Sequence, residues 1–410
     1  MQGPLAGVKV VEAGMVVAGA MVTASLADLG AEVIKIEPVK GDEIRRVGKK
    51  KDGEPLLWRV IARNKQVIAV DLNNPKGAEV VRKIISTADA FVENFRPGRV
   101  AEFGLDYKTL SAINPKLVMV HLSGYGQTGP YSRRPGLGTL AEAFSGWSHV
   151  TGEANGPPTL PYYPMADAFA ALTATYAILA GIIGREVRGG RGDEIDISLY
   201  EPILNFQGSM AIDYDQLDFV SRRRGNRILE WTPRNTYRTS DDRWFVVSSF
   251  GSATLRLFNA IGREDLASDM SLLVYANRVE RTDEIDGAIA EWGLAHTLDE
   301  VLAAFQAHDV IGGPVNDISQ LMADEHVRNR GTFVNVDDDR LGQVRLQSVV
   351  PRFSGNPGAI RWPGRSVIGA DTRDVLLGAG FSDEDIRNLH RDSAIHAAGI
   401  QDAPSTTADA

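Results

Sequence analysis

Short apolar runs bounded by turn residues alternate with helix-like stretches through the first half of the chain. Strands are expected at Val8–Glu12, Ala31–Glu37, Val67–Leu72, Ala90–Phe95, Leu117–Leu122 and Glu194–Leu199. Helices are expected between them, at Met21–Leu29 and from the Asn74 cap and Pro75 to about Ser86. Strands alternating with helices predict an open, mainly parallel sheet covered on both faces. Ligands bind such sheets beyond the carboxyl ends of the strands. We therefore expect one functional rim formed by the loops Val16–Ala18, Leu72–Asn74, Asn94–Arg96 and Ser123–Tyr125.

The second half of the chain has a different pattern. Beyond a basic linker, Arg222–Arg227, a strand is expected at Trp244–Ser248, helices at Leu255–Ile261, Thr282–Gly293 and Leu298–His308, and a turn into a strand at Val310–Val315. This pattern predicts a smaller α+β domain. Strands near Val334–Val336 and Val344–Leu346 and a last helix, Asp383–His390, are expected to return to the first domain. We thus predict a discontinuous large domain from 1–215 and 335–400, a small domain from 225–330 and a flexible tail at 401–410.

The longest apolar stretch, Ala168–Ile183, directly follows Asp167, which is the only charged residue between Glu153 and Arg185. The stretch is apolar nearly all round, which predicts a helix buried in a large core. It reaches the lower limit of a membrane span, but its Ala-rich composition favours a core helix. Asp167 is expected where this helix begins. It is interpreted as an N-cap or as a carboxylate that the positive helix end keeps ionised for nucleophilic attack, and the two roles are compatible.

Composition narrows the functional classes. With 410 residues, 43% of them hydrophobic and 24% charged, two soluble domains are the default. The absence of cysteine removes disulfides, thiolate catalysis and Cys-based metal sites, and we expect no metal centre. A net charge of −9 argues against nonspecific nucleic-acid binding. The loop after the first strand lacks the spaced glycines of a dinucleotide site. No signal peptide is visible at Met1, so we expect a cytoplasmic protein without a membrane partner.

Ten short strings along the chain resemble the family III CoA-transferases, which include formyl-CoA:oxalate CoA-transferase and α-methylacyl-CoA racemase. They occur in the family's order over nearly the whole chain, at 4–10, 29–37, 64–65, 92–98, 113–117, 123–131, 151–153, 190–192, 225–227 and 380–386. The resemblance implies an open α/β large domain, a small domain and two chains interlocked as a dimer. It also implies an enzyme that moves CoA from an acyl-CoA donor to a free carboxylic acid.

The resemblance also assigns site residues. Asp167 stands at the position of the family's nucleophile, which forms a mixed anhydride and then an aspartyl-CoA thioester. CoA is then a substrate, with no permanently bound cofactor. The implied CoA contacts are Val17, Ala18, Val70, Asp71, Leu72, Asn73, Asn94, Phe95, Arg96, Pro135, Gly136, Leu137 and Gly138. Arg96, Arg133 and Arg134 are the candidates for pairing with CoA phosphates, because guanidinium groups match phosphate oxygens.

Four departures from family patterns bear on the reaction. Pro38 and Asn73 replace basic CoA contacts of the formyl-CoA enzyme. Gly136–Gly138 lacks the His of the racemases, for which Glu142, His149 or Tyr125 would have to substitute. The four-glycine run of the oxalate branch is reduced to Ser248–Ser252, which makes oxalate a doubtful acceptor. Arg227, Arg234 and Arg238 are candidates for holding a second carboxylate of a dicarboxylic acceptor.

These observations favour a CoA-transferase with Asp167 as nucleophile and succinyl-CoA as a candidate donor. One alternative is an acyl-CoA racemase or epimerase. The other is a non-catalytic CoA-binding subunit that works only beside a paralogous partner. The expected assembly is accordingly an interlocked homodimer or a heteromer with a paralogue.

Overall fold

The computed structural model describes residues 3–228 and 231–400. The predicted tail at 401–410 lies outside these residues. The chain divides into two compact units, each described by itself. The large unit contains residues 3–147, 161–209 and 331–400, and the small unit contains 148–160 and 210–330. The domain boundaries given above stay a prediction.

A seven-stranded sheet forms the centre of the large unit, with strand order β14-β5-β2-β1-β6-β7-β8. The strands are β1 Lys9–Glu12, β2 Glu32–Glu37, β5 Lys65–Val70, β6 Ala90–Glu93, β7 Val118–Ser123, β8 Glu194–Ser198 and β14 Ile395–His396. All neighbours are parallel except β14, which is antiparallel to β5. The mainly parallel sheet predicted from the alternating pattern is therefore confirmed.

The strand order reverses direction at β1. From β1 the chain moves outward through β2 to β5, and it then returns to the other side of β1 with β6, β7 and β8. The loops that follow β1 and β6 consequently lead away from each other and leave a crevice at their carboxyl ends. Open α/β sheets bind ligands at this kind of switch point.

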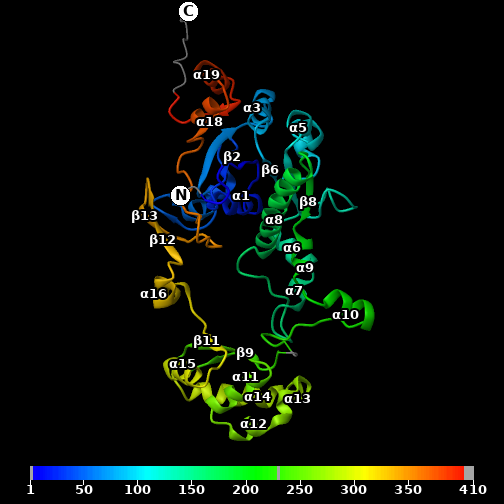
Figure 1. Ribbon diagram of the computed structural model, residues 1–410, viewed down its shortest axis with the longest axis vertical. Coiled ribbons are helices and arrows are strands. Elements are labelled where there is room, and N and C mark those ends of the chain that lie inside the picture. The colour runs from blue at the N-terminus through cyan, green and yellow to red at the C-terminus, as the bar shows by residue number, and fades with distance from the viewer. Residues whose placement is uncertain (1–2, 229–230, 401–410) are drawn as a thin grey trace, which may run out of the picture. The chain divides into compact units, whose positions relative to one another are not determined.

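Helices cover both faces of the sheet and enclose two apolar cores (Figure 1). One core joins the sheet to α3, α5, α18 and α19, and the other joins it to α1, α6, α8 and α9. The helices of the large unit are α1 Ala18–Asp28, η1 Glu43–Arg46, α2 Leu56–Ile61, α3 Pro75–Ile85, α4 Arg99–Glu102, α5 Tyr107–Ile113, α6 Gly138–Phe144, α8 Met165–Arg188, α9 Tyr200–Asn205, α18 Thr372–Gly378 and α19 Asp383–Arg391. Asn74 caps α3 as predicted, with its side chain accepting the Lys76 N–H at 3.0 Å.

Two hairpins complete the large unit. They are β3 Lys50–Lys51 with β4 Glu54–Pro55, and β12 Phe333–Asp338 with β13 Gly342–Gln347. The second contains both strands predicted near residues 334–336 and 344–346.

The small unit has a three-stranded antiparallel sheet in the order β11-β10-β9, packed against helices around Phe245, Phe258 and Phe305. Its strands are β9 Arg234–Arg238, β10 Trp244–Ser248 and β11 Gly312–Pro314. Its helices are α10 Met210–Leu217, α11 Ser252–Ala260, α12 Glu264–Ser268, η3 Met270–Leu273, α13 Tyr275–Glu280, α14 Thr282–Leu294, α15 Leu298–Ala307, α16 Ile318–Ala323 and α17 Glu325–Asn329, and the chain enters the unit through α7 Trp147–Val150. The predicted α+β composition is confirmed.

Helix α8 differs from the prediction at its first turn. It begins at Met165, with Pro164 in the cap position and no side-chain cap, so Asp167 is the third helical residue. The predicted N-cap role of Asp167 is therefore wrong. Proline suits a helix entry because its φ is fixed near the helical value, and here Pro164 has a φ of −66°.

The burial of α8 also differs from the prediction. Its small residues, among them Ala170 and Ala174, pack towards α1 in the second core. Four apolar side chains on one face of the helix are instead 58–78% exposed, namely Leu172, Tyr176, Ile183 and Val187, which we call the α8 stripe. Burial all round the helix is therefore wrong for the single chain. Within the described residues, α8 is the one helix whose length and composition would suffice to cross a bilayer.

Candidate active site

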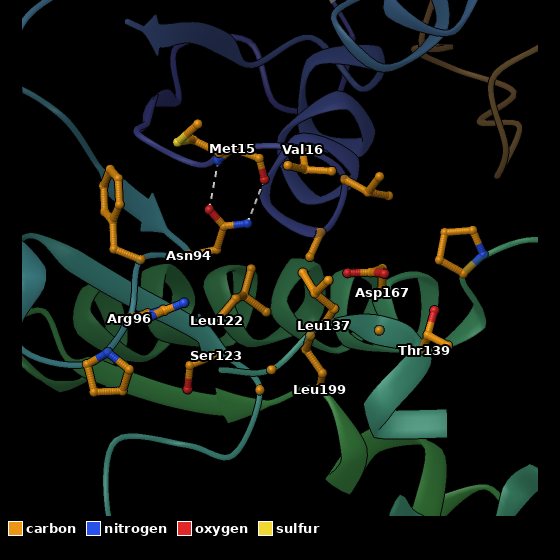
Figure 2. A pocket seen from close by; sticks show the side chains of 18 of the residues that line it. Met15, Val16, Asn94, Arg96, Leu122, Ser123, Leu137, Thr139, Asp167 and Leu199 are labelled. Carbon is orange, nitrogen blue, oxygen red and sulfur yellow. Dashed lines mark hydrogen bonds between the residues drawn. The ribbon is translucent and has the colours of Figure 1, made fainter. Parts of the chain in front are cut away.

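A cavity of about 340 Å³ lies at the carboxyl ends of β1, β6 and β7, at the switch point of the sheet (Figure 2). Its wall is mostly apolar and is interrupted by a few polar and charged groups. The lining residues are Met15–Ala18, Asn94–Pro97, Leu122–Gly124, Arg134, Gly136–Thr139, Pro164, Asp167 and Leu199.

The loop after β1 forms one wall of the cavity. Asn94, directly after β6, holds Met15 through both arms of its side-chain amide. Its Oδ1 accepts the Met15 N–H and its Nδ2 donates to the Met15 carbonyl, each at 2.7 Å. The next residue, Val16, has a left-handed φ of +65°. This loop conformation is imposed by contacts across the sheet, because a valine does not adopt it readily by itself.

Asp167 occupies the opposite wall, in the first turn of α8 (Figure 2). Gly138, the first residue of α6, lies directly against it, and a Cβ added at Gly138 would stand 2.1 Å from Asp167 Oδ2. The absence of a side chain at residue 138 therefore gives the carboxylate its space.

Burial, and after it the nearby carboxylate of Glu142, raise the pKa of Asp167 to about 6, while the residue's own backbone N–H acts in the opposite direction. Glu142 is 2% exposed, and its Oε1 accepts the N–H of Ala166 at 3.2 Å. The helix end was expected to favour the charged form of Asp167. Desolvation outweighs that effect, and the carboxylate is more basic than an ordinary aspartate.

Two arginines line the same cavity. Arg96 follows β6, and Arg134 stacks over the Tyr131 ring at 3.7 Å. Among the described residues neither of them has an ion-pair partner. Both guanidinium groups are therefore available for an anionic ligand, although the protein is acidic overall. Arg133 is exposed and does not line the cavity.

Most of the residues implied by the resemblance come together here. The cavity is lined by Val17, Ala18, Asn94, Phe95, Arg96, Gly136, Leu137, Gly138 and Asp167. Pro135 and residues 70–73 are not part of its lining. Val70 ends β5 and residues 71–73 follow it, and β5 is separated from β1 by β2. The loops after β5 and β6 are nevertheless linked, because Arg99 donates to Asn73 Oδ1 at 2.6 Å.

The three arginines suggested for the acceptor are held within the small unit. Arg227 pairs with Asp283 at 2.8 Å and with Asp286 at 2.7 Å. Arg238 pairs with Asp242, and Arg234 donates to the carbonyl of Asn226. These contacts reduce the capacity of Arg227 in particular to bind a further carboxylate.

None of the three residues considered as a substitute for the racemase histidine lines the cavity in which a base would act on the substrate. Glu142 is buried behind the start of α8 and does not line the cavity. Tyr125 packs edge-on against Tyr131 and Phe144. His149 belongs to the small unit.

Several lining residues were not identified as site residues from the sequence, among them Met15, Thr139, Pro164 and Leu199. Met15 belongs to a loop that was correctly placed on the rim, so the alternating pattern contained a signal for it. Leu199 follows β8 and lies at the end of the predicted strand Glu194–Leu199, so the pattern contained a signal for it as well. Pro164 precedes α8, and only tertiary packing brings it to the cavity.

The architecture and the cavity together define a class of protein. It is a doubly wound α/β protein with a partly buried, basic carboxylate and two arginines around an apolar cavity at the switch point. The chain matches the model of CoA-transferase family III over residues 5–372 and belongs to that family. It is therefore a CoA-transferase, and the resemblance seen in the sequence is confirmed.

Individual relatives cover almost the full chain. The chain is 36% identical over 390 residues to succinyl-CoA–D-citramalate CoA-transferase of Chloroflexus aurantiacus, covering 94% of this chain and 96% of the relative. It is 35% identical over 393 residues to the β subunit of succinyl-CoA–L-malate CoA-transferase of the same organism, covering 94% and 96%. The crystal structure of a CAIB/BAIF family protein from Brucella suis matches with a TM-score of 0.79 and 30% identity, covering 92% of this chain and all of that one.

Proposed function

We propose that this chain transfers CoA from succinyl-CoA to a free dicarboxylic acid through covalent intermediates on Asp167. The observation that carries the proposal is a partly buried carboxylate of raised pKa on the wall of an apolar cavity, which is also lined by two arginines that have no ion-pair partner in the part of the chain that the structure describes. Nucleophilic catalysis suits this exchange because it divides one difficult substitution into simple acyl transfers.

In the first half-reaction, an Asp167 oxygen attacks the thioester carbonyl. The C–S bond breaks, CoA leaves as thiolate, and a mixed anhydride joins Asp167 to the donor acyl group. The thiolate then attacks the Asp167 carbonyl carbon, so that the donor leaves as a free carboxylate and an aspartyl-CoA thioester remains. The acceptor carboxylate repeats these steps in reverse order, and the cycle neither consumes nor releases a proton.

The environment of Asp167 fits the chemical demands of this sequence. With a pKa of about 6, the carboxyl is about nine-tenths ionised at pH 7, and it is more basic than an ordinary aspartate. The apolar side chains of Val16, Leu122 and Leu137 line the cavity, and an acyl-CoA packed against them would exclude the water that hydrolyses an anhydride.

Arg96 and Arg134 are the proposed partners of CoA phosphate oxygens, since they line the cavity and have no ion-pair partner among the described residues. The contact of Arg99 with Asn73 extends this polar strip from the cavity to the loop after β5. The predicted CoA contacts at residues 70–73 are retained in the proposal as an outer part of the binding surface.

The acceptor is proposed to be a 2-hydroxydicarboxylic acid. Two relatives are named for D-citramalate and L-malate, both of this class, and both names give succinyl-CoA as the CoA donor. Such an acid resembles succinate in length, so donor and acceptor acyl groups can occupy the same cavity in turn.

We also propose that the active species is an interlocked dimer. The α8 stripe supports this, because exposed apolar patches of this kind mark protein–protein interfaces. One relative is named as a β subunit, so the second chain of this dimer is either identical or a paralogue. Light scattering together with an activity assay of the purified chain distinguishes the two.

The test of the proposal is an exchange assay. Purified chain is mixed with succinyl-CoA and each of a panel of mono- and dicarboxylic acids, and new thioesters are measured by mass spectrometry. The expected result is a new thioester with hydroxydicarboxylic acids and none with Asp167→Ala. Incorporation of solvent deuterium at C2 of a 2-methylacyl-CoA, without an acceptor, would instead identify a racemase.

A further inference from the structure

Val16 is held in a conformation that its side chain disfavours. Its φ of +65° is left-handed, where a β-branched residue is a genuine outlier. It lies on the wall of the cavity that faces Asp167 (Figure 2). Strained backbone persists only where the surrounding structure imposes it, and such strain collects at functional sites.

The first restraint on this loop is Asn94. Both arms of its amide are bonded to the residue before Val16, with the Met15 N–H and the Met15 carbonyl each at 2.7 Å. A side-chain amide has few remaining positions for a ligand once both of its polar atoms are used in this way. The geometry thus indicates a structural clamp at a residue that the family resemblance assigned to CoA.

The second restraint is Lys35 of β2. Its Nζ donates to the Gly14 carbonyl at 2.8 Å and to Glu12 Oε1 at 2.7 Å, and it lies 3.0 Å from Asp42. Lys35 and Glu12 are both fully buried. A buried ammonium group is costly unless all of its N–H donors have partners, so the hydrogen bond from Lys35 holds the Gly14 carbonyl in place.

The remaining contacts leave this cluster little freedom. Glu12 Oε2 accepts from Lys65 at 2.8 Å, and Lys65, also fully buried, donates to the Ala20 carbonyl in α1 at 2.8 Å. A Cβ on Gly14 would lie 3.2 Å from the Cα of Gly19. Lys35 and Lys65, which do not line the cavity, thus fix the two ends of the loop, while Asn94, which does line it, holds Met15 between them.

We propose that Asn94 and Lys35 are positioning residues, which hold Val16 left-handed so that the loop backbone is set against the acyl group attacked by Asp167. The inference rests on the proposed function. It gives Asn94 a role other than contacting CoA, and kinetics distinguish the two roles. Loss of a positioning residue lowers kcat, whereas loss of a CoA contact raises KM for acyl-CoA.

The primary test is Asn94→Ala combined with a change at Val16. Loss of two hydrogen bonds to one residue should lower kcat by about 30-fold and leave KM for acyl-CoA within about twofold. Val16→Gly added to Asn94→Ala should recover about tenfold of the loss, because glycine adopts this φ without strain. Val16→Asn is the second rescue, since asparagine tolerates the left-handed region better than valine.

The matched control is Asn114→Ala. Asn114 is also a buried amide that holds a turn, donating to the carbonyls of Ile85 at 3.1 Å and Ala88 at 2.7 Å, and it is not part of the cavity. This variant should lose stability with kcat unchanged, and Val16→Gly should not improve its kcat.

Lys35 is tested as Lys35→Met together with Asp42→Asn, which keeps the buried cluster neutral so that folding is preserved. This double variant should also lower kcat, and Val16→Gly should restore it.

Hydrogen exchange gives a readout independent of activity. Exchange in a peptide covering residues 13–18 should rise at least about tenfold in Asn94→Ala and stay unchanged in Asn114→Ala.

Three results would overturn the inference: a raised KM with unchanged kcat in Asn94→Ala, a kcat loss that neither change at Val16 relieves, or unchanged exchange at residues 13–18. If the unaltered chain lacks CoA transfer, the proposed function fails first. The exchange measurement then still decides whether the clamp exists.

Discussion

Replacing Asp167 by asparagine should stabilise the protein while it abolishes CoA transfer. Folding places the Asp167 carboxyl in a site that raises its pKa from 3.8 to about 6, mainly through burial and secondly through the charge of Glu142. A carboxylate that ionises less readily in the folded state than in the unfolded state costs stability wherever it is ionised. The Asp167→Asn substitution keeps the size of the side chain and removes that cost, so it isolates the effect of the charge.

The magnitude follows from the pKa difference. About two pKa units at 1.36 kcal/mol each amount to about 3 kcal/mol, which is an upper figure because the amide must also be desolvated. The folded state binds the proton more tightly, so the cost is complete above about pH 7 and disappears as the pH falls through 6 towards 3.8. The gain in stability from Asp167→Asn should therefore be about half as large at pH 5 as at pH 8.

Thermal unfolding at several pH values measures this effect. For a unit of about 260 residues, a stability gain of about 3 kcal/mol corresponds to a rise in Tm of about 5–6 °C at pH 8. The control is Glu186→Gln, an exposed acid on the same helix, which should change stability by less than about 0.5 kcal/mol. An Asp167→Asn variant with unchanged or lower Tm at pH 8, or a gain of equal size at pH 5, would refute the reasoning.

Three further substitutions test the site. Glu142→Gln keeps an acceptor for the Ala166 N–H but removes a negative charge near Asp167. The acidic limb of the pH profile of kcat/KM should therefore move down from about pH 6 by about one pH unit. An unmoved limb would show that Glu142 does not act on the nucleophile. Gly138→Ala should lower kcat at least about 100-fold, because the added Cβ would displace the Asp167 carboxylate. The control is Gly287→Ala, whose added Cβ would meet no atom within 4 Å, and it should leave kcat unchanged. Normal turnover by Gly138→Ala would contradict the geometry. Arg96→Ala should raise KM for acyl-CoA about tenfold, and the difference should shrink at high salt; a salt-independent KM would argue against a phosphate contact.

The sheet and its crossovers could be derived from the sequence because each element had a local cause. Asn74 and Pro75 define the start of α3 by themselves, and the run Trp244–Ser248 has the bounds of β10. The rim at the ends of β1, β6 and β7 followed from the alternation of strands and helices. The same alternation also placed the loop Leu72–Asn74 on this rim, but this loop does not line the cavity, because β2 separates β5 from β1 and the alternation does not give the strand order.

The failures come from positions where tertiary structure overrides local preference. Asp167 has an excellent capping side chain, yet Pro164 takes the cap position and Asp167 enters the first turn. The apolar character of α8 does not tell whether the second face is covered by the same chain or left exposed. The buried position of Glu142 behind α8 was likewise invisible, because it depends on how the short helix α6 packs.

The central claim is that Asp167 is covalently joined to both acyl groups during turnover, and oxygen-18 tests it most directly. In the proposed sequence, the bridging oxygen of the second anhydride comes from the acceptor carboxylate and stays on Asp167 when CoA thiolate attacks the acceptor carbonyl. Turnover with an oxygen-18-labelled acceptor should therefore place the label in the peptide that carries Asp167, as read by mass spectrometry. Formation of the new thioester without label in that peptide would contradict the account.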